Sequence, residues 1–113
     1  MDFEILKNHN WKYNITFSGF HRFPSNGRKI RYIIRSLRKK FKCKIFYFCM
    51  ISKPKIHLLL FSSKDIELTE NNLPYIGAEI KIRKIINVSN VIDYLANKYT
   101  DKSVCLLTLN KEK

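Results

Sequence analysis

Large apolar and polar residues alternate along several stretches of this chain, and this period of two predicts β-strands. Over residues 11–17, Trp11, Tyr13, Ile15 and Phe17 fall on one side of the predicted strand, with polar side chains between them. Further stretches of strand character cover residues 44–51, 56–62, 79–86 and 103–109. The turn at residues 52–55 joins two of these strands into a hairpin apolar enough to be central in a sheet.

Two segments instead repeat their apolar residues at the helical period. The first is residues 28–41, where Ile30, Ile33, Ile34, Leu37 and Phe41 share one face. The second is residues 88–99, which repeats Val88, Val91, Ile92, Leu95 and Tyr99. Residues 63–78 leave two interpretations open: Ser63 could cap a short helix, but several residues after Glu70 break the pattern.

The order of these elements predicts an α+β fold in one domain spanning residues 1–113. The simplest closure is an antiparallel sheet of about five strands with the two main helices on one face, a ferredoxin-like sandwich. We expect residues 1–9 and 110–113 to be flexible.

Positive charge is concentrated in the first part of the chain. The chain has 22 basic and 9 acidic residues, and a net charge of +13. Residues 1–64 hold 15 of the basic and 2 of the acidic side chains, and no carboxylate side chain occurs from Ile5 to Lys64. A hydrophobic content of 45% excludes a disordered basic tail. The counter-charge must therefore come from outside, and a polyanion supplies it most readily.

The densest basic segment is the predicted helix at residues 28–41. A charge run is usually a solvated face, but such faces mix signs, and this one has no acidic partner. The pattern therefore favours contact with nucleic acid. The candidate nucleic-acid-binding residues are Arg28, Lys29, Arg31, Arg35, Arg38, Lys39, Lys40, Lys42 and Lys55.

Cysteine usage and hydropathy indicate a cytoplasmic, reducing location. The three cysteines, Cys43, Cys49 and Cys105, are odd in number and show no CxxC spacing, so neither a disulfide framework nor a zinc knuckle is suggested. The longest apolar run, residues 45–51, is far shorter than the ~20 residues that cross a bilayer. The first residues lack the order of a signal peptide, and no membrane partner is expected.

Two side chains are candidates for chemistry. His57 lies on a predicted strand, where a lone histidine is more often structural than a metal ligand. Tyr94 lies at the margin of the apolar face of the second helix, with Asn90 and Lys98 one turn before and after it. A nearby ammonium favours the phenolate form that a tyrosine nucleophile requires. The alternative is a tyrosine at the edge of the core beside a solvated lysine.

Taken in order, three segments resemble motifs of the HUH endonucleases, the rolling-circle replication initiators of small plasmids and viruses and the related single-tyrosine transposases. Residues 10–20 are similar to the first motif, a strand ending in a Thr-Phe step, here Thr16 and Phe17. Residues 56–60 resemble the second motif, in which two histidines separated by one apolar residue bind a divalent ion. Residues 94–99 resemble the third, a helix with the nucleophilic tyrosine followed by a lysine.

The chain departs from this pattern at two positions. Lys55 stands where the family has the first histidine of the pair, and Lys98 follows Tyr94 by four positions where the family usually has three. Both lysine spacings reach the same face of a helix. A protonated Lys55 is a poor metal ligand, which leaves open a weak ion site, a site completed by Glu79, and no metal at all.

The resemblance implies a replication initiator that nicks single-stranded DNA. Mg²⁺ or Mn²⁺ at His57, with Glu79 as a further ligand, would polarise the scissile phosphate. Tyr94 would attack it, leaving a 5′-phosphotyrosine link and a free 3′-hydroxyl, and Lys98 would assist. The alternative is a non-catalytic module that binds nucleic acid, for instance an RNA-binding, ribosome-associated or structural protein. Lys55 favours the alternative, and the order of the three motifs favours the endonuclease. A third possibility, ranked last, is that the cationic surface binds an acidic protein.

Overall fold

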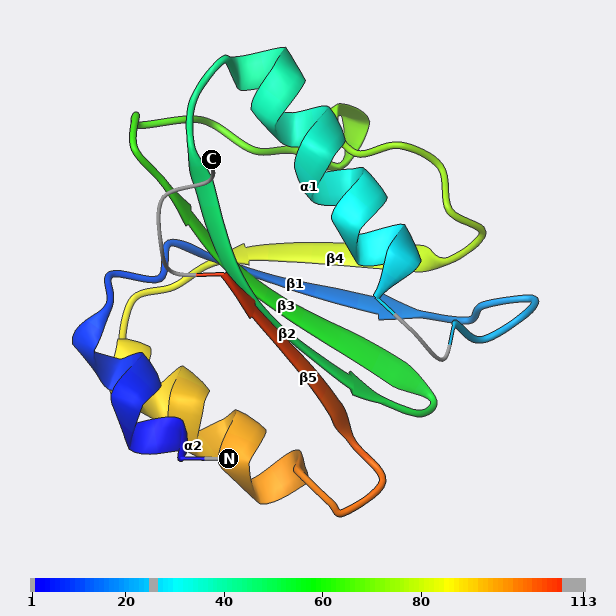
Figure 1. Cartoon of the computed structure of the whole chain (residues 1–113), viewed down its shortest axis with the longest axis vertical. Coiled ribbons are helices and arrows are strands. Elements are labelled where there is room, and N and C mark those ends of the chain that lie inside the picture. The colour runs from blue at the N-terminus through cyan, green and yellow to red at the C-terminus, as the bar shows by residue number, and fades with distance from the viewer. Residues whose placement is uncertain (1, 25–26, 109–113) are drawn as a thin grey trace.

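The protein forms one five-stranded antiparallel sheet flanked by two main helices, as seen in a computed structural model that describes residues 2–24 and 27–108 (Figure 1). The strand order across the sheet is β4-β1-β3-β2-β5. This arrangement confirms the predicted α+β fold. The elements are η1 (Phe3–Asn8), β1 (Tyr13–Ser18), α1 (Arg28–Phe41), β2 (Ile45–Ser52), β3 (Lys55–Ser62), η2 (Glu70–Asn72), β4 (Glu79–Lys84), α2 (Val88–Lys98) and β5 (Val104–Thr108), where η marks a 3₁₀-helix.

The central strands β2 and β3 are buried on both faces. Leu58 and Leu59, which point to opposite sides of β3, are both fully buried. On one side, α1 packs its apolar stripe against the sheet through Ile30, Ile33, Ile34 and Leu37. This larger core also includes the inward side chains of β1, namely Tyr13, Ile15 and Phe17.

The second helix covers the other side of the sheet. Ile92 and Leu95 of α2 pack with Phe48, Met50 and Leu59 of the central strands. In Figure 1, α1 and α2 lie on either side of the sheet. The prediction that both helices share one face is therefore wrong. A hairpin with apolar side chains at consecutive positions needs cover on both of its faces.

The N-terminal segment packs against α2. Leu6 in η1 is fully buried, and its carbonyl accepts a hydrogen bond of 2.8 Å from the Trp11 indole. Lys7 forms an ion pair of 2.8 Å with Asp93 of α2. The expected flexibility of residues 1–9 stays a prediction, and within this segment Leu6 packs in the core under α2. Residues 110–113 lie outside the described residues.

The segment before β4 adds a covering loop to the larger core. It contains only the short η2, but Ile66, Leu68, Leu73 and Ile76 are all buried. The Tyr13 hydroxyl donates to the Ile66 carbonyl at 2.9 Å and accepts from the Leu68 amide at 3.1 Å. Four buried apolar side chains and the Tyr13 hydroxyl therefore hold this segment against the core, although η2 is its only regular element.

No helix in the described part of the chain is long and apolar enough to cross a membrane.

The burial of one face of α1 predicts that substitutions at two neighbouring residues change the free energy of unfolding by very different amounts. Ile33 is fully buried and Tyr32 is 53% exposed. We expect Ile33→Ala to lower the free energy of unfolding by about 2–5 kcal/mol, because it leaves a cavity in the core. Tyr32→Ala should change it by no more than about 0.5 kcal/mol. Urea denaturation followed by circular dichroism measures both, and equal losses would contradict the assignment of the buried face.

Candidate functional site

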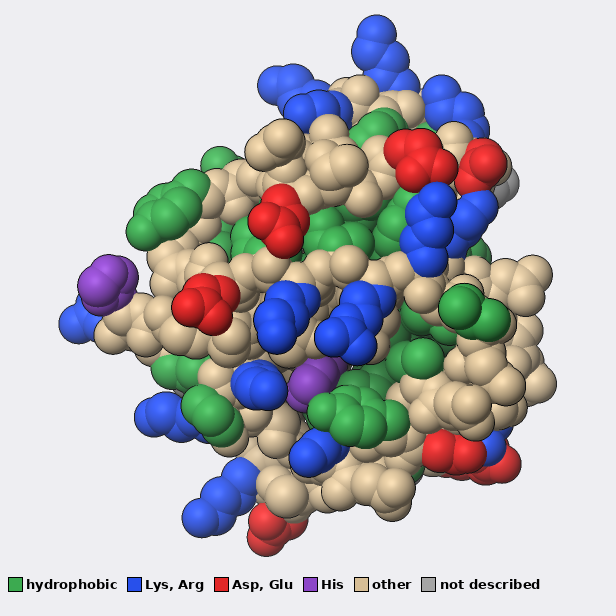
Figure 2. Space-filling model, turned by 180° about the vertical axis from the view of Figure 1, so that it is seen from behind, with side chains coloured by type: hydrophobic (Ala, Val, Ile, Leu, Met, Phe, Trp, Pro, Cys, Tyr) green, Lys and Arg blue, Asp and Glu red, His purple; other side chains and the backbone are tan. Residues whose placement is uncertain are grey.

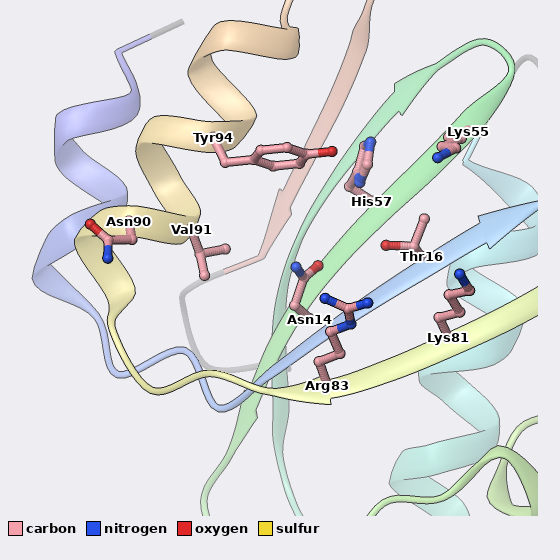
Figure 3. Close-up of a pocket in the computed structure, with 9 residues that line it drawn as sticks. All are labelled: Asn14, Thr16, Lys55, His57, Lys81, Arg83, Asn90, Val91 and Tyr94. Atoms are coloured by element: carbon pink, nitrogen blue, oxygen red, sulfur yellow. The ribbon is translucent and has the colours of Figure 1, made fainter.

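A polar pocket lies next to α2, over the part of the sheet that this helix leaves uncovered. On the α2 side, the strands β1 and β4 expose polar side chains, because their apolar alternates point into the core under α1. The pocket has a volume of about 350 Å³ and opens between these strands and α2. Figure 3 shows the side chains that line it: Asn14, Thr16, Lys55, His57, Lys81, Arg83, Asn90, Val91 and Tyr94.

The register of three neighbouring strands brings the sheet residues of the pocket together. Thr16 of β1 is opposite His57 on one side and opposite Lys81 on the other. Asn14, two residues earlier, is opposite Arg83. Lys55 precedes His57 by two positions on β3 and so shares its face. Adjacent strands lie about 4.8 Å apart, so the side chains of β3 and β4 flank the β1 residues between them and can approach one ligand from both sides.

Tyr94 approaches the same row from the helix. Its side chain extends from α2 with the hydroxyl toward His57 (Figure 3), and the two ring centroids are 6.1 Å apart. The residue is 47% exposed. The Lys98 ammonium lies 5.5 Å from the centroid of the Tyr94 ring, as expected for residues one helical turn apart. The structure thus gathers His57, Tyr94 and Lys98, although His57 is distant from the other two in the sequence.

The pocket is strongly cationic. Lys55, Lys81 and Arg83 line it, and none of the described residues that line it is acidic. Within the described part of the chain, no ion pair joins any of these three side chains to a carboxylate. Figure 2, which views the molecule from behind, shows basic side chains gathered around a histidine on this side. An uncompensated positive cluster in a concave site attracts anions.

Burial and positive neighbours keep the His57 imidazole neutral. The side chain is only 5% exposed. Burial lowers the pKa of His57 below its ordinary value, and the charges of Lys55 and Lys98 lower it further. Its Nδ1 atom is buried without a hydrogen-bond partner from the described residues, and so is Oδ1 of Asn14. Buried polar atoms are normally paired, so both atoms are available to a ligand group or a water molecule that enters the pocket.

The residues around His57 do not fit a divalent metal ion. Glu79 is exposed and precedes Lys81 by two residues on β4. It lines a neighbouring hollow with Pro74, Tyr75 and Lys81 and is not among the residues that line the His57 pocket. Among the described residues, no three histidine, cysteine or acidic side chains are grouped closely enough to hold an ion. Divalent ions such as Mg²⁺ and Mn²⁺ need several oxygen or imidazole ligands, whereas the charged neighbours of His57 are cations. We therefore derive no chemical step through a metal.

The predicted nucleic-acid-binding residues fall into two groups on opposite sides of the sheet. Lys55 lines the pocket, whereas the others belong to α1 or follow it directly. Lys29 donates to the Ile76 carbonyl at 3.2 Å, and Arg38 donates to the Ile45 carbonyl at 2.7 Å. These two side chains therefore tie α1 to the rest of the fold. The exposed basic residues of this segment, which we call the α1 surface, are Arg28, Arg31, Arg35, Lys39, Lys40 and Lys42.

Sequence reasoning singled out Thr16 of β1 but not Asn14, nor Lys81 and Arg83 of β4. Lys81 and Arg83 alternate with Ile80 and Ile82, so the sequence showed that they leave the core. It could not show that β4 pairs with β1, or that Thr16 lies between His57 and Lys81. Strand order across a sheet is a tertiary property.

Comparisons of this chain with protein-family models, with curated proteins and with solved structures found no match.

The lowered pKa of His57 predicts a pH-dependent stability. The unfolded chain binds a proton at this histidine near pH 6.5, and the folded chain binds it only at lower pH. Protonation therefore favours unfolding, and the stability associated with neutral His57 is present above pH 6.5 and is lost as the pH falls toward the folded-state pKa. We expect His57→Gln to lose less stability than the wild type between about pH 7.5 and pH 5.

Urea denaturation at several pH values measures this loss. The matched control is His21→Gln, which removes an exposed histidine and should follow the wild type. If His57→Gln loses as much stability as the wild type, burial of a neutral His57 is the wrong explanation.

Proposed function

We propose that this protein binds single-stranded DNA with one phosphodiester in the pocket and nicks it through Tyr94, as an HUH-like replication initiator. The observation on which the proposal rests is the Tyr94 hydroxyl, which points toward His57 in a cationic pocket (Figure 3). A tyrosine at the edge of a core has no need of three unpaired basic side chains around it. A tyrosine that attacks a phosphodiester does, because charge accumulates on the phosphate oxygens.

The pocket favours one strand over a duplex. It lies between a helix and a sheet, and its volume of about 350 Å³ is at the lower end of the range of small-molecule sites. A single strand can bend its backbone into such a recess. Lysine and arginine then contact the phosphate, and these contacts position a strand without reading its sequence.

The reaction needs no further reactant. The Tyr94 oxygen forms a bond to phosphorus, the bond from phosphorus to the 3′ oxygen breaks, and the strand that begins with this phosphate at its 5′ end remains attached to the enzyme. The phenol proton finally resides on the released 3′-hydroxyl. We assign the transfer of this proton to neutral His57, whose ring centroid lies 6.1 Å from that of Tyr94 and which would have to come within hydrogen-bond reach of the phenol when the strand binds.

The α1 surface supplies a second area for polyanion contact. Helix α1 packs on the side of the sheet opposite α2, so its exposed basic residues face away from the pocket. We propose that the α1 surface holds nucleic acid flanking the nicked segment, by phosphate contacts that do not depend on sequence.

The three free thiols are compatible with the reducing interior of a cell.

A second candidate function is non-catalytic binding of nucleic acid, with RNA as the alternative ligand. Lys55 favours it, because this lysine stands where the resemblance requires a histidine that binds metal. Both functions use the same cationic surfaces. They differ in whether a covalent bond forms at Tyr94.

We expect incubation with labelled single-stranded DNA to give a covalent adduct that survives a denaturing gel. Tyr94→Phe should abolish the adduct while retaining binding, because it removes only the attacking oxygen. Tyr75→Phe is the matched control, since Tyr75 is 86% exposed and lines a different hollow. Reactions in Mn²⁺ over a set of DNA and RNA sequences test the proposal. An adduct that persists in Tyr94→Phe would overturn the nucleophile, and salt-dependent binding without any adduct would favour the second function.

For the α1 surface, Arg35→Gln combined with Lys39→Gln should weaken binding on any sequence and make it less sensitive to salt. The slope of log affinity against log salt should fall by roughly one to two, because two phosphate contacts are lost. Fluorescence anisotropy over a range of salt concentrations measures this slope. The control combines Lys64→Gln with Lys102→Gln, which removes two exposed lysines outside α1. An equal effect in the control would show that the loss of any two positive charges weakens binding, and would contradict a specific contact at the α1 surface.

A further inference from the structure

We propose that the pocket holds the phosphate by direct contact with Lys55, Lys81 and Arg83 and needs no divalent ion. This inference rests on the proposed function and gives it a metal-free mechanism. The three side chains come from β3 and β4 and approach the row of His57 and Thr16 from different positions. A phosphate bound next to the Thr16 side chain would have positive charge on either side.

The charge around the pocket disfavours a divalent ion. Lys55 is two residues from His57 on the same face of β3, and the Lys98 ammonium lies against the Tyr94 ring. Lys81 and Arg83 add two further positive charges from β4. A divalent ion at His57 would face these charges without a single carboxylate among the described lining residues to offset them. No favourable interaction in the pocket would offset the cost of desolvating the ion and its repulsion by the basic side chains.

The same charges fit a phosphodiester. The diester has one negative charge, and a second develops when the tyrosine oxygen adds to phosphorus. Basic side chains that are already in place stabilise that charge in the transition state. The Arg83 guanidinium can donate two parallel hydrogen bonds to phosphate oxygens, and the lysine ammonium groups act as point charges.

The residues of the pocket are also available to a ligand. Lys55, Lys81 and Arg83 are exposed, and no described carboxylate pairs with them. Other lysines of this chain do pair: Lys7 with Asp93, Lys12 with Asp65 and Lys84 with Glu67. Lys84 and Lys81 lie on the same strand, and of these two only Lys84 has an acidic partner among the described residues. The fold therefore leaves unpaired the basic side chains that line the pocket.

Two assays in excess EDTA test this proposal on the whole protein. The first measures binding of a fluorescent single-stranded DNA, and the second measures formation of the Tyr94 adduct. We expect the wild type to behave alike in EDTA and in Mn²⁺ in both assays. Lys55→Gln, Lys81→Gln and Arg83→Gln should each weaken binding in EDTA, and each should slow the adduct on the order of 100-fold. Lys102→Gln, an exposed lysine outside the pocket, is the matched control and should do neither.

The outcomes separate this inference from the proposed function. A Tyr94-dependent adduct that is lost in EDTA would overturn the metal-free site and leave nicking in place. An absent adduct, together with EDTA-resistant binding weakened by the three variants, would overturn nicking and support the metal-free phosphate site. Binding in EDTA that the three variants do not weaken more than Lys102→Gln would also overturn the metal-free site. Circular dichroism confirms that each variant is folded, which is expected because all four side chains are exposed.

Discussion

The burial of the β2–β3 hairpin on both faces is the constraint on which the rest of the structure depends. Apolar side chains at consecutive positions, such as Leu58 and Leu59, cannot all point to one layer. One helix must therefore cover each face, and the strands β1 and β4, which are apolar on the α1 side and polar on the α2 side, lie to one side of the hairpin. On the α1 side the loop before β4 completes the core. On the α2 side the cover ends sooner, and the pocket lies there.

This division also separates the two basic regions of the molecule. The α1 surface faces outward from the larger core, and the pocket lies beyond the other face of the sheet. A single continuous track for nucleic acid would have to pass around an edge of the sheet. The two regions are better understood as distinct contacts, a broad one on a helix and a confined one next to a tyrosine.

The pocket combines features that are costly for folding. His57 is buried with an unpaired nitrogen, and positive side chains cluster without acidic partners among the described residues. Unpaired buried polar atoms and like charges both destabilise a folded chain. Elsewhere in the described structure, lysines such as Lys7 and Lys84 find carboxylates. A buried unpaired imidazole nitrogen next to a cluster of basic side chains is typical of sites that bind a ligand.

The periodicity of the sequence was sufficient to predict the strands, the two helices and the charged face of α1, because side-chain direction follows from local backbone geometry. It also placed His57 on a strand and Tyr94 at the margin of the apolar face of α2. Only the tertiary structure decided that the helices lie on opposite faces, that Lys81 and Arg83 join His57, and that Glu79 does not. Those facts depend on which strands are neighbours and in what register, and pairing between distant segments is set by the packing of the whole chain.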